Sequence, residues 1–196
     1  MADLQPFVDF ILELDKLKGV TRKTQPLGLT RYENSAEHSW QIAMLGLSLA
    51  HLAESPVDVN RVVQMLLVHD VGEIDAGDTI VYATEGLSER QAAERAGAMR
   101  VLGMVPEPRR TEFIALWEEF ERSDTPESRF ANAVDRAMPV LLNLANNGQS
   151  WRENGIRYEQ VVTRVGPQVN AGCPALWSYL EARLAEARDR GWFGGA

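Results

Sequence analysis

The sequence VNRVVQMLLVHDVGEIDAGD, residues 59–78, decides how this chain is expected to fold. Apolar residues recur at helical spacing in its first half, and the pair His69-Asp70 follows at the end of that pattern. Such spacing is typical of an amphipathic helix that packs one face against a core. The stretch therefore predicts a helix that ends in two ionisable side chains beside the core.

Two other predicted helices carry an ionisable residue on the apolar face. One begins its apolar stripe with His38, and the other has Asp135 within its stripe. An unpaired buried carboxylate is costly, so these groups need a shared partner. Imidazole and carboxylate groups together form a ligand set that divalent transition metals favour. The three stripes predict one metal site formed by His38, His69, Asp70 and Asp135.

A structural role for these residues is the alternative interpretation. A single histidine or aspartate that faces a core is more often hydrogen-bonded than metal-bound, and a His–Asp pair can join two helices without an ion. Three independent stripes that each carry a ligand-type residue favour the metal site. The remaining histidine, His51, falls on another face of its helix at about 100° per residue, and we do not expect it to bind the ion.

Helical periodicity runs through nearly the whole chain, and the alternation typical of strands is absent. Helices are expected at residues 4–17, 36–54, 59–70, 88–102, 107–122, 126–147, 157–165 and 174–190. Ser35 is expected to cap the second of them. The long irregular segments 19–34 and 71–87 flank the His/Asp set, and such loops are often functional. We predict one all-α domain of about seven or eight helices, with a metal-site core at about 10–147 and a C-terminal helical extension at 157–190.

Composition limits the partners of the chain. Acidic residues outnumber basic ones by 28 to 20, which gives a formal charge of −8. This charge disfavours polymeric nucleic acid and anionic membranes, whereas a small phosphorylated ligand can still bind local basic residues. Cys173 is the only cysteine, so no internal disulfide forms. No apolar run approaches the ~18 residues of a membrane span and no signal peptide is evident, so we expect a cytoplasmic protein.

Two segments resemble the H…HD…D signature of HD-domain metal-dependent phosphohydrolases: HDVGEIDAGD at 69–78 and ENSAEHS at 33–39. The similarity runs from about Phe10 to Asn147, includes ALWEEFE at 115–121, and is greatest to the branch of YfbR-like 5′-deoxynucleotidases. The resemblance implies an all-helical homodimer that hydrolyses nucleoside 5′-monophosphates to nucleoside and phosphate.

The resemblance also implies roles for single residues. It carries over four metal ligands, His38, His69, Asp70 and Asp135. It implies that Glu73 and Asp78 act in acid/base chemistry or position water, and that Arg22 contacts the phosphate. Lys23 stands where the bacterial deoxynucleotidases usually have a tryptophan near the sugar. Selectivity for deoxyribose therefore stays open, together with the preference for a base.

The ion and the substrate have alternatives. Two imidazoles with two carboxylates suit one Mn²⁺, Co²⁺, Fe²⁺, Ni²⁺ or Zn²⁺ per chain better than Mg²⁺. An HD-type hydrolase could instead act on a nucleoside triphosphate, guanosine tetraphosphate or a cyclic nucleotide. Triphosphates would favour more basic residues than Arg22, Lys23 and Arg31, and a second ion would need further histidines. The non-enzyme alternative is a helical signalling module, but such modules typically lose the metal ligands.

Overall fold

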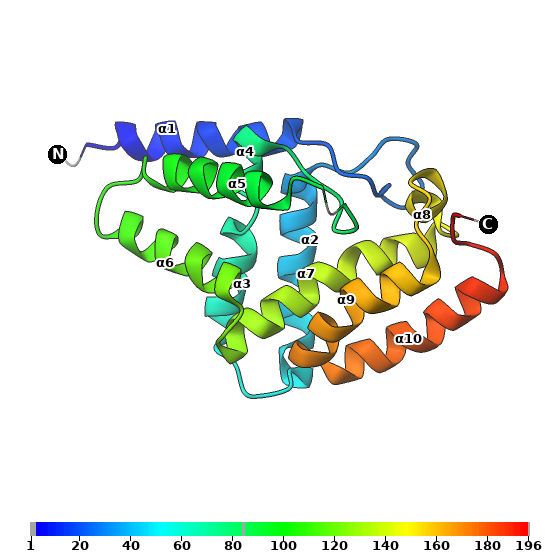
Figure 1. The fold of residues 1–196 in the computed structure, drawn as a ribbon. Helices are drawn as coiled ribbons and strands as arrows, with labels where there is room; N and C mark the ends of the chain where they lie inside the picture. Colours follow the sequence, from blue (N-terminus) through cyan, green and yellow to red (C-terminus); the bar gives the residue numbers. More distant parts are fainter. Residues whose placement is uncertain (1–2, 84, 196) are drawn as a thin grey trace.

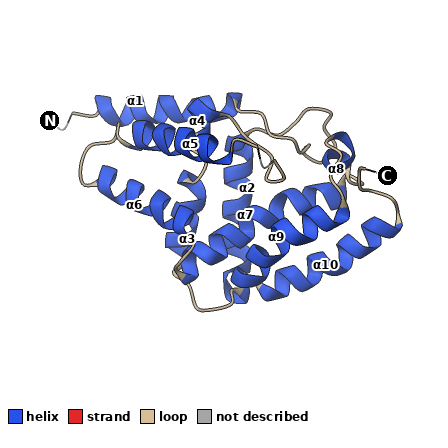
Figure 2. Cartoon of the chain, viewed as in Figure 1, coloured by secondary structure: helices blue, strands red, loops and turns tan. Residues whose placement is uncertain are grey.

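The computed structural model describes residues 3–83 and 85–195, and there the chain consists of helices joined by loops (Figure 1, Figure 2). The elements are α1 (Gln5–Leu14), η1 (Asp15–Gly19), α2 (Ser35–Leu49), η2 (Ala50–Leu52), α3 (Val59–Val68), α4 (Glu73–Ala76), α5 (Leu87–Leu102), α6 (Arg109–Arg122), α7 (Pro126–Ala145), α8 (Gln149–Glu153), α9 (Tyr158–Gly172) and α10 (Pro174–Asp189). Within the described residues no β-strand forms, and one isolated antiparallel bridge joins Thr21 to Asn34. The expected all-α fold is confirmed. Among the described helices, none combines the length and apolar content needed to cross a membrane.

Helix α7 forms the centre of the molecule and packs against α2, α3, α6, α9 and α10. In Figure 1 it lies between α2 and α9. Its buried side chains include Phe130, Val134, Ala137 and Met138. A helix that is apolar on most of its faces is stable only inside a core, where the hydrophobic effect outweighs the loss of hydration. Asp135, on the same helix, is thereby carried into the interior.

Helix α2 begins with a capping box. The side chain of Asn34 accepts a hydrogen bond from the backbone N–H of Glu37, and the Glu37 carboxylate accepts one from the Asn34 N–H. The expectation that Ser35 caps this helix is wrong. Ser35 is already helical and buried, and its hydroxyl donates to Oε2 of Glu73 at 2.6 Å. The cap therefore lies one residue earlier, and the serine is free to contact another segment.

The segment after His69-Asp70 lies directly on α5. A Cβ atom at Gly72 would lie 2.2 Å from the backbone oxygen of Glu94, and one at Gly97 would lie 2.6 Å from the backbone oxygen of Gly72. Only glycine permits two backbones to come this close. This contact fixes the short helix α4, which falls in a stretch expected to be irregular, and brings α5 to the edge of the site.

Two further elements differ from the expectation. Helix α9 continues through Pro167 to Gly172, although the sequence predicted an end at about residue 165. Gly166 lies against Trp177 of α10, where a Cβ would come within 2.8 Å of the indole. Val161, Val165 and Val169 of α9 are buried in the core, and we attribute the continued helix to this packing. The short helix α8 was not predicted, because five residues are too few for a recognisable helical period.

Candidate metal centre and active site

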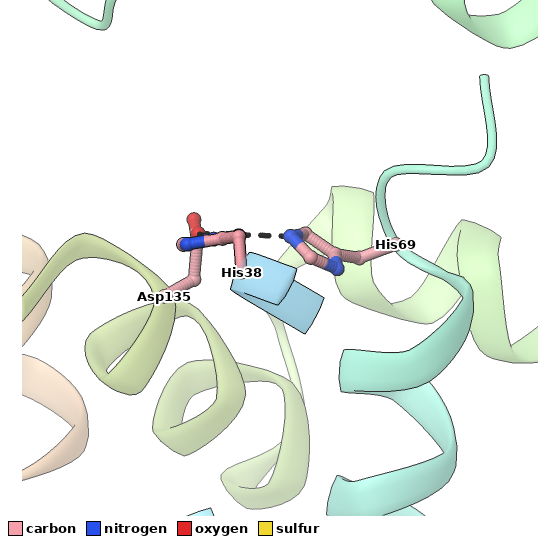
Figure 3. A group of neighbouring side chains, drawn as sticks. All are labelled: His38, His69 and Asp135. Carbon is pink, nitrogen blue, oxygen red and sulfur yellow. Dashed lines mark hydrogen bonds and ion pairs between the residues drawn. The ribbon is translucent and has the colours of Figure 1, made fainter. Parts of the chain in front are cut away.

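Three predicted ligand residues meet at the centre of the fold. His38 comes from α2, His69 follows α3 and Asp135 lies on α7, and one ligand atom of each lies within 4.8 Å of the others. Nε2 of His38 is 2.9 Å and Nε2 of His69 is 3.6 Å from Oδ1 of Asp135 (Figure 3). All three residues are buried. The ligand-type residues on the apolar stripes of three helices thus meet at one point, as expected from their helical phase.

Asp70, the fourth predicted ligand, lies at the edge of this group. Its Oδ1 is 2.9 Å from Nε2 of His69, and its Oδ2 accepts a hydrogen bond of 2.9 Å from Nη1 of Arg22. Adjacent helical residues point about 100° apart. His69 and Asp70 nevertheless face the same space because they follow the last residue of α3.

The chemistry of these side chains fits a divalent transition metal ion. Nδ1 of His69 lies 2.9 Å from the backbone oxygen of Leu66, while its buried Nε2 faces the carboxylates of Asp70 at 2.9 Å and Asp135 at 3.6 Å. Histidine ligands of metals usually donate their other ring N–H in this manner, which fixes the ring and its tautomer. Two imidazole nitrogens and nearby carboxylate oxygens complete a mixed N/O donor set.

The charges around the two histidines favour a cation at this point. Burial lowers the pKa of His69, but the carboxylates of Asp70 and Asp135 outweigh burial and raise it to about 10. Burial, together with repulsion from Arg22, lowers the pKa of His38 to about 4. In this arrangement a proton on His69 supplies the positive charge that the two carboxylates require, which is the electrostatic role of a metal ion.

Backbone hydrogen bonds hold the loop that carries Arg22. Its backbone N–H donates to the carbonyl of Glu33 at 3.0 Å, and the Ser35 N–H donates to the carbonyl of Val20 at 3.1 Å. The Arg22 side chain is 12% exposed, and its Nη1 lies 3.7 Å from Glu73 and 3.5 Å from Asp78 in addition to its bond with Asp70. Burial disfavours its charge, yet the surrounding carboxylates raise the pKa of Arg22 above its usual value. Arg22 thus neutralises an acidic cluster in the site.

Glu73 and Asp78 line the same cavity from one side. Burial raises the pKa of Glu73 to about 9, with repulsion from Asp70 in support. Burial likewise raises the pKa of the Asp78 carboxyl, against the attraction of Arg22. Carboxyl groups with raised pKa values beside a cavity are suited to proton transfer near neutral pH. Glu73 begins the short helix α4, and Asp78 follows the end of that helix.

Two adjoining cavities open beside the histidines. The larger has a volume of about 200 Å³, is lined by His69, Asp70 and Glu73, and reaches α5. The smaller has a volume of about 70 Å³ and is lined by Lys23, Tyr82 and Trp151. Their linings share Arg22, Asp78, Asp135 and Arg136. Lys23 is exposed, so it lies at the rim of the smaller cavity.

Sequence reasoning missed several residues of the site. Glu33 is 1% exposed, and its Oε1 lies 3.9 Å from Nδ1 of His38, behind the ring. The indole N–H of Trp117 donates to the backbone oxygen of His69 at 3.0 Å, and the Phe120 ring lies 5.0 Å from the His69 ring. Glu33 was within the quoted motif and could have been singled out. His51 is exposed, as expected.

Comparison with known proteins agrees with this geometry. A 5′-deoxynucleotidase YfbR of Escherichia coli is 30% identical over 146 residues, which are 69% of this chain and 73% of that protein. A 5′-deoxynucleotidase HDDC2 of Danio rerio is 24% identical over 139 residues, 68% of each chain. A crystal structure of a predicted metal-dependent phosphohydrolase from Magnetospirillum magnetotacticum is 38% identical, with a TM-score of 0.89, and the match covers 97% of this chain and 98% of that one.

A family model covers most of the chain. The model described as HD domain matches residues 14–177, a range that includes His38, His69, Asp70, Asp135 and helices α2 to α9. The resemblance of HDVGEIDAGD and ENSAEHS to this family is therefore confirmed. By the extent of this match, the chain belongs to the HD domain family.

Proposed function

We propose that this protein is a metal-dependent phosphomonoesterase that hydrolyses nucleoside 5′-monophosphates to nucleoside and phosphate. The observation that carries the proposal is the buried group of His38, His69 and Asp135, which opens into a cavity with Arg22, Glu73 and Asp78. The names of the relatives from Escherichia coli and Danio rerio support this class of substrate.

In this proposal the ion is held by His38, His69, Asp70 and Asp135. When bound, a divalent cation polarises the phosphoryl group and acidifies the attacking water. The protein orients the ligands: the Leu66 carbonyl fixes the ring of His69, and the buried Glu33 lies behind His38. Phosphoryl transfer depends mainly on positioning and charge neutralisation, and this arrangement supplies both.

Glu73 and Asp78 have different roles in the proposed reaction. Glu73 accepts the proton of the attacking water, and the Ser35 hydroxyl, which donates to Oε2 at 2.6 Å, orients its carboxylate. Burial, with repulsion from Asp70 in support, raises the pKa of Glu73, and a cation held by Asp70 would oppose that shift and favour the carboxylate form needed for a base. Asp78, whose Oδ1 lies 3.5 Å from Nη1 of Arg22, positions the water or protonates the leaving 5′-oxygen.

A phosphate-release assay tests this function. The substrates are paired ribonucleoside and deoxyribonucleoside 5′-monophosphates, with triphosphates, guanosine tetraphosphate and cyclic nucleotides as comparisons, and Mn²⁺, Co²⁺ or Mg²⁺ is supplied. We expect release from monophosphates, its loss after chelation, and its recovery when the transition metal is restored. No release from any monophosphate would contradict the proposal. The ribose and deoxyribose forms of each substrate are compared because Lys23 lies at the cavity rim, at the position where the bacterial deoxynucleotidases usually have a tryptophan near the sugar.

We also propose that the protein is a homodimer, as its family resemblance implies. Large apolar side chains are exposed at the N-cap of α1 and along α1 and α2, including Leu4, Ile11, Leu12 and Trp40, each at 61–65%. Exposed apolar surface of this kind often marks an interface. Size-exclusion chromatography with light scattering should give twice the chain mass, and a mass of one chain at micromolar concentration would refute the dimer.

A further inference from the structure

Arg136 follows the proposed ligand Asp135 on α7 and lines both cavities of the site. Because adjacent helical residues point about 100° apart, Asp135 can face the histidines while Arg136 faces the cavities. Its side chain is 32% exposed, so the stem is largely buried and the guanidinium can be reached from the cavity. None of the roles described above uses this residue.

The guanidinium of Arg136 is not satisfied by its surroundings. Its buried Nε has no hydrogen-bond partner among the described residues, and the neighbouring carboxylate atom, Oδ2 of Asp135, is 3.7 Å away. Buried donors are nearly always paired, so an unpaired one in a binding cavity indicates a missing acceptor. Arginine presents its donors as a planar fork that matches phosphate oxygens.

Arg22, the other arginine that lines both cavities, has less free hydrogen-bonding capacity. Four carboxylates surround it: Asp70 at 2.9 Å, Asp78 at 3.5 Å, Glu33 at 3.6 Å and Glu73 at 3.7 Å. A phosphate monoester is a dianion, and it enters a cavity whose walls already carry an excess of acidic groups. A phosphate bound by Arg22 alone would compete with those carboxylates. Among the described residues, the ion-pair contact of the Arg136 guanidinium is Oδ2 of Asp135 at 3.7 Å, so its N–H groups are free to bind phosphate oxygens.

We propose that Arg136 is a second substrate-binding arginine, which donates to the phosphate oxygens of the monoester beside Arg22. This inference rests on the proposed phosphomonoesterase function. It assigns phosphate affinity to the α7 side of the site, where the two cavities share a wall. A purely structural role, in which Arg136 only neutralises Asp135, predicts instead a change in metal affinity or stability.

The test compares Arg136→Gln with Arg183→Gln, an arginine on α10 that lines neither cavity. Both changes remove one positive charge. Binding of inorganic phosphate to the Mn²⁺-loaded proteins is measured by calorimetry, together with manganese content and melting temperature. For Arg136→Gln we expect phosphate affinity to fall on the order of ten- to a hundredfold, as for loss of a hydrogen bond to a charged group. Manganese content and melting temperature should match the wild type.

Steady-state kinetics give a second measurement. Arg136→Gln should raise KM for the monophosphate substrate more than it lowers kcat, and Arg136→Lys should recover part of the loss because it keeps the charge without the fork. Unchanged phosphate affinity and KM in Arg136→Gln would overturn the inference even if the wild type is active. A wild type that releases no phosphate would refute the proposed function, and phosphate binding would still decide the role of Arg136.

Discussion

Replacement of Asp135 by asparagine is expected to remove the ion and, with it, nearly all phosphate release. Oδ1 of Asp135 is the atom that both histidines approach, at 2.9 Å and 3.6 Å. An amide is a neutral and weaker ligand of nearly the same shape, so the fold should survive. We expect a loss of activity of roughly a thousandfold or more, because a Lewis-acid ion contributes several kcal/mol to the barrier reduction. Metal analysis and initial rates measure both effects.

Asp189→Asn is the matched control for this change. Asp189 ends α10 and is exposed, with Arg188 as its ion-pair partner. It should keep full metal content and full rate. An Asp135→Asn protein that binds the ion with wild-type affinity would show that the buried group is not the metal site, whatever its activity.

Glu73→Gln is expected to separate catalysis from metal binding. The variant removes the proposed base, while the amide can still accept the hydrogen bond from Ser35. The rate should fall by about a hundred- to ten-thousandfold, the usual contribution of general acid–base catalysis. The ion and KM should change little, because Glu73 is not among the proposed ligands. Single-turnover phosphate release gives the rate, metal analysis of the same sample gives the ion content, and steady-state kinetics give KM.

Glu181→Gln, at an exposed position on α10, makes the same chemical change outside the site. Its rate should equal that of the wild type. If Glu73→Gln kept more than a tenth of the wild-type kcat with its ion bound, Glu73 would be an orienting residue and the base would have to be sought elsewhere, with Asp78 as the first candidate.

The convergence of the buried histidines and Asp135 could be predicted because helical phase is a local property of the sequence. His38, His69 and Asp135 each lie on an apolar stripe, and a stripe must face the core. Their convergence then followed from the cost of burying charge without a partner. Helix ends and short helices were less predictable: α4 and α8 contain four and five residues, too few to show a period.

The environment of the two arginines could not be predicted in the same way. Arg22 lies in a loop, and its burial depends on contacts with Glu33, Asp70 and Asp78 that no local pattern contains. Arg136 was overlooked because a charged residue next to a stripe is usually interpreted as part of a solvated face. Its position in a cavity depends on the loop at residues 78–82, which α7 alone does not reveal.

The wide spacing of the proposed ligands also has a consequence for biosynthesis. His38 and Asp135 are 97 positions apart in the chain. At roughly 5–20 residues per second, a ribosome adds Asp135 about 5–20 s after His38. During that interval the nascent chain presents imidazoles without the carboxylate that joins them. The full set of proposed ligands is therefore present only after Asp135 has been added, so we expect the ion to bind late in the maturation of the chain.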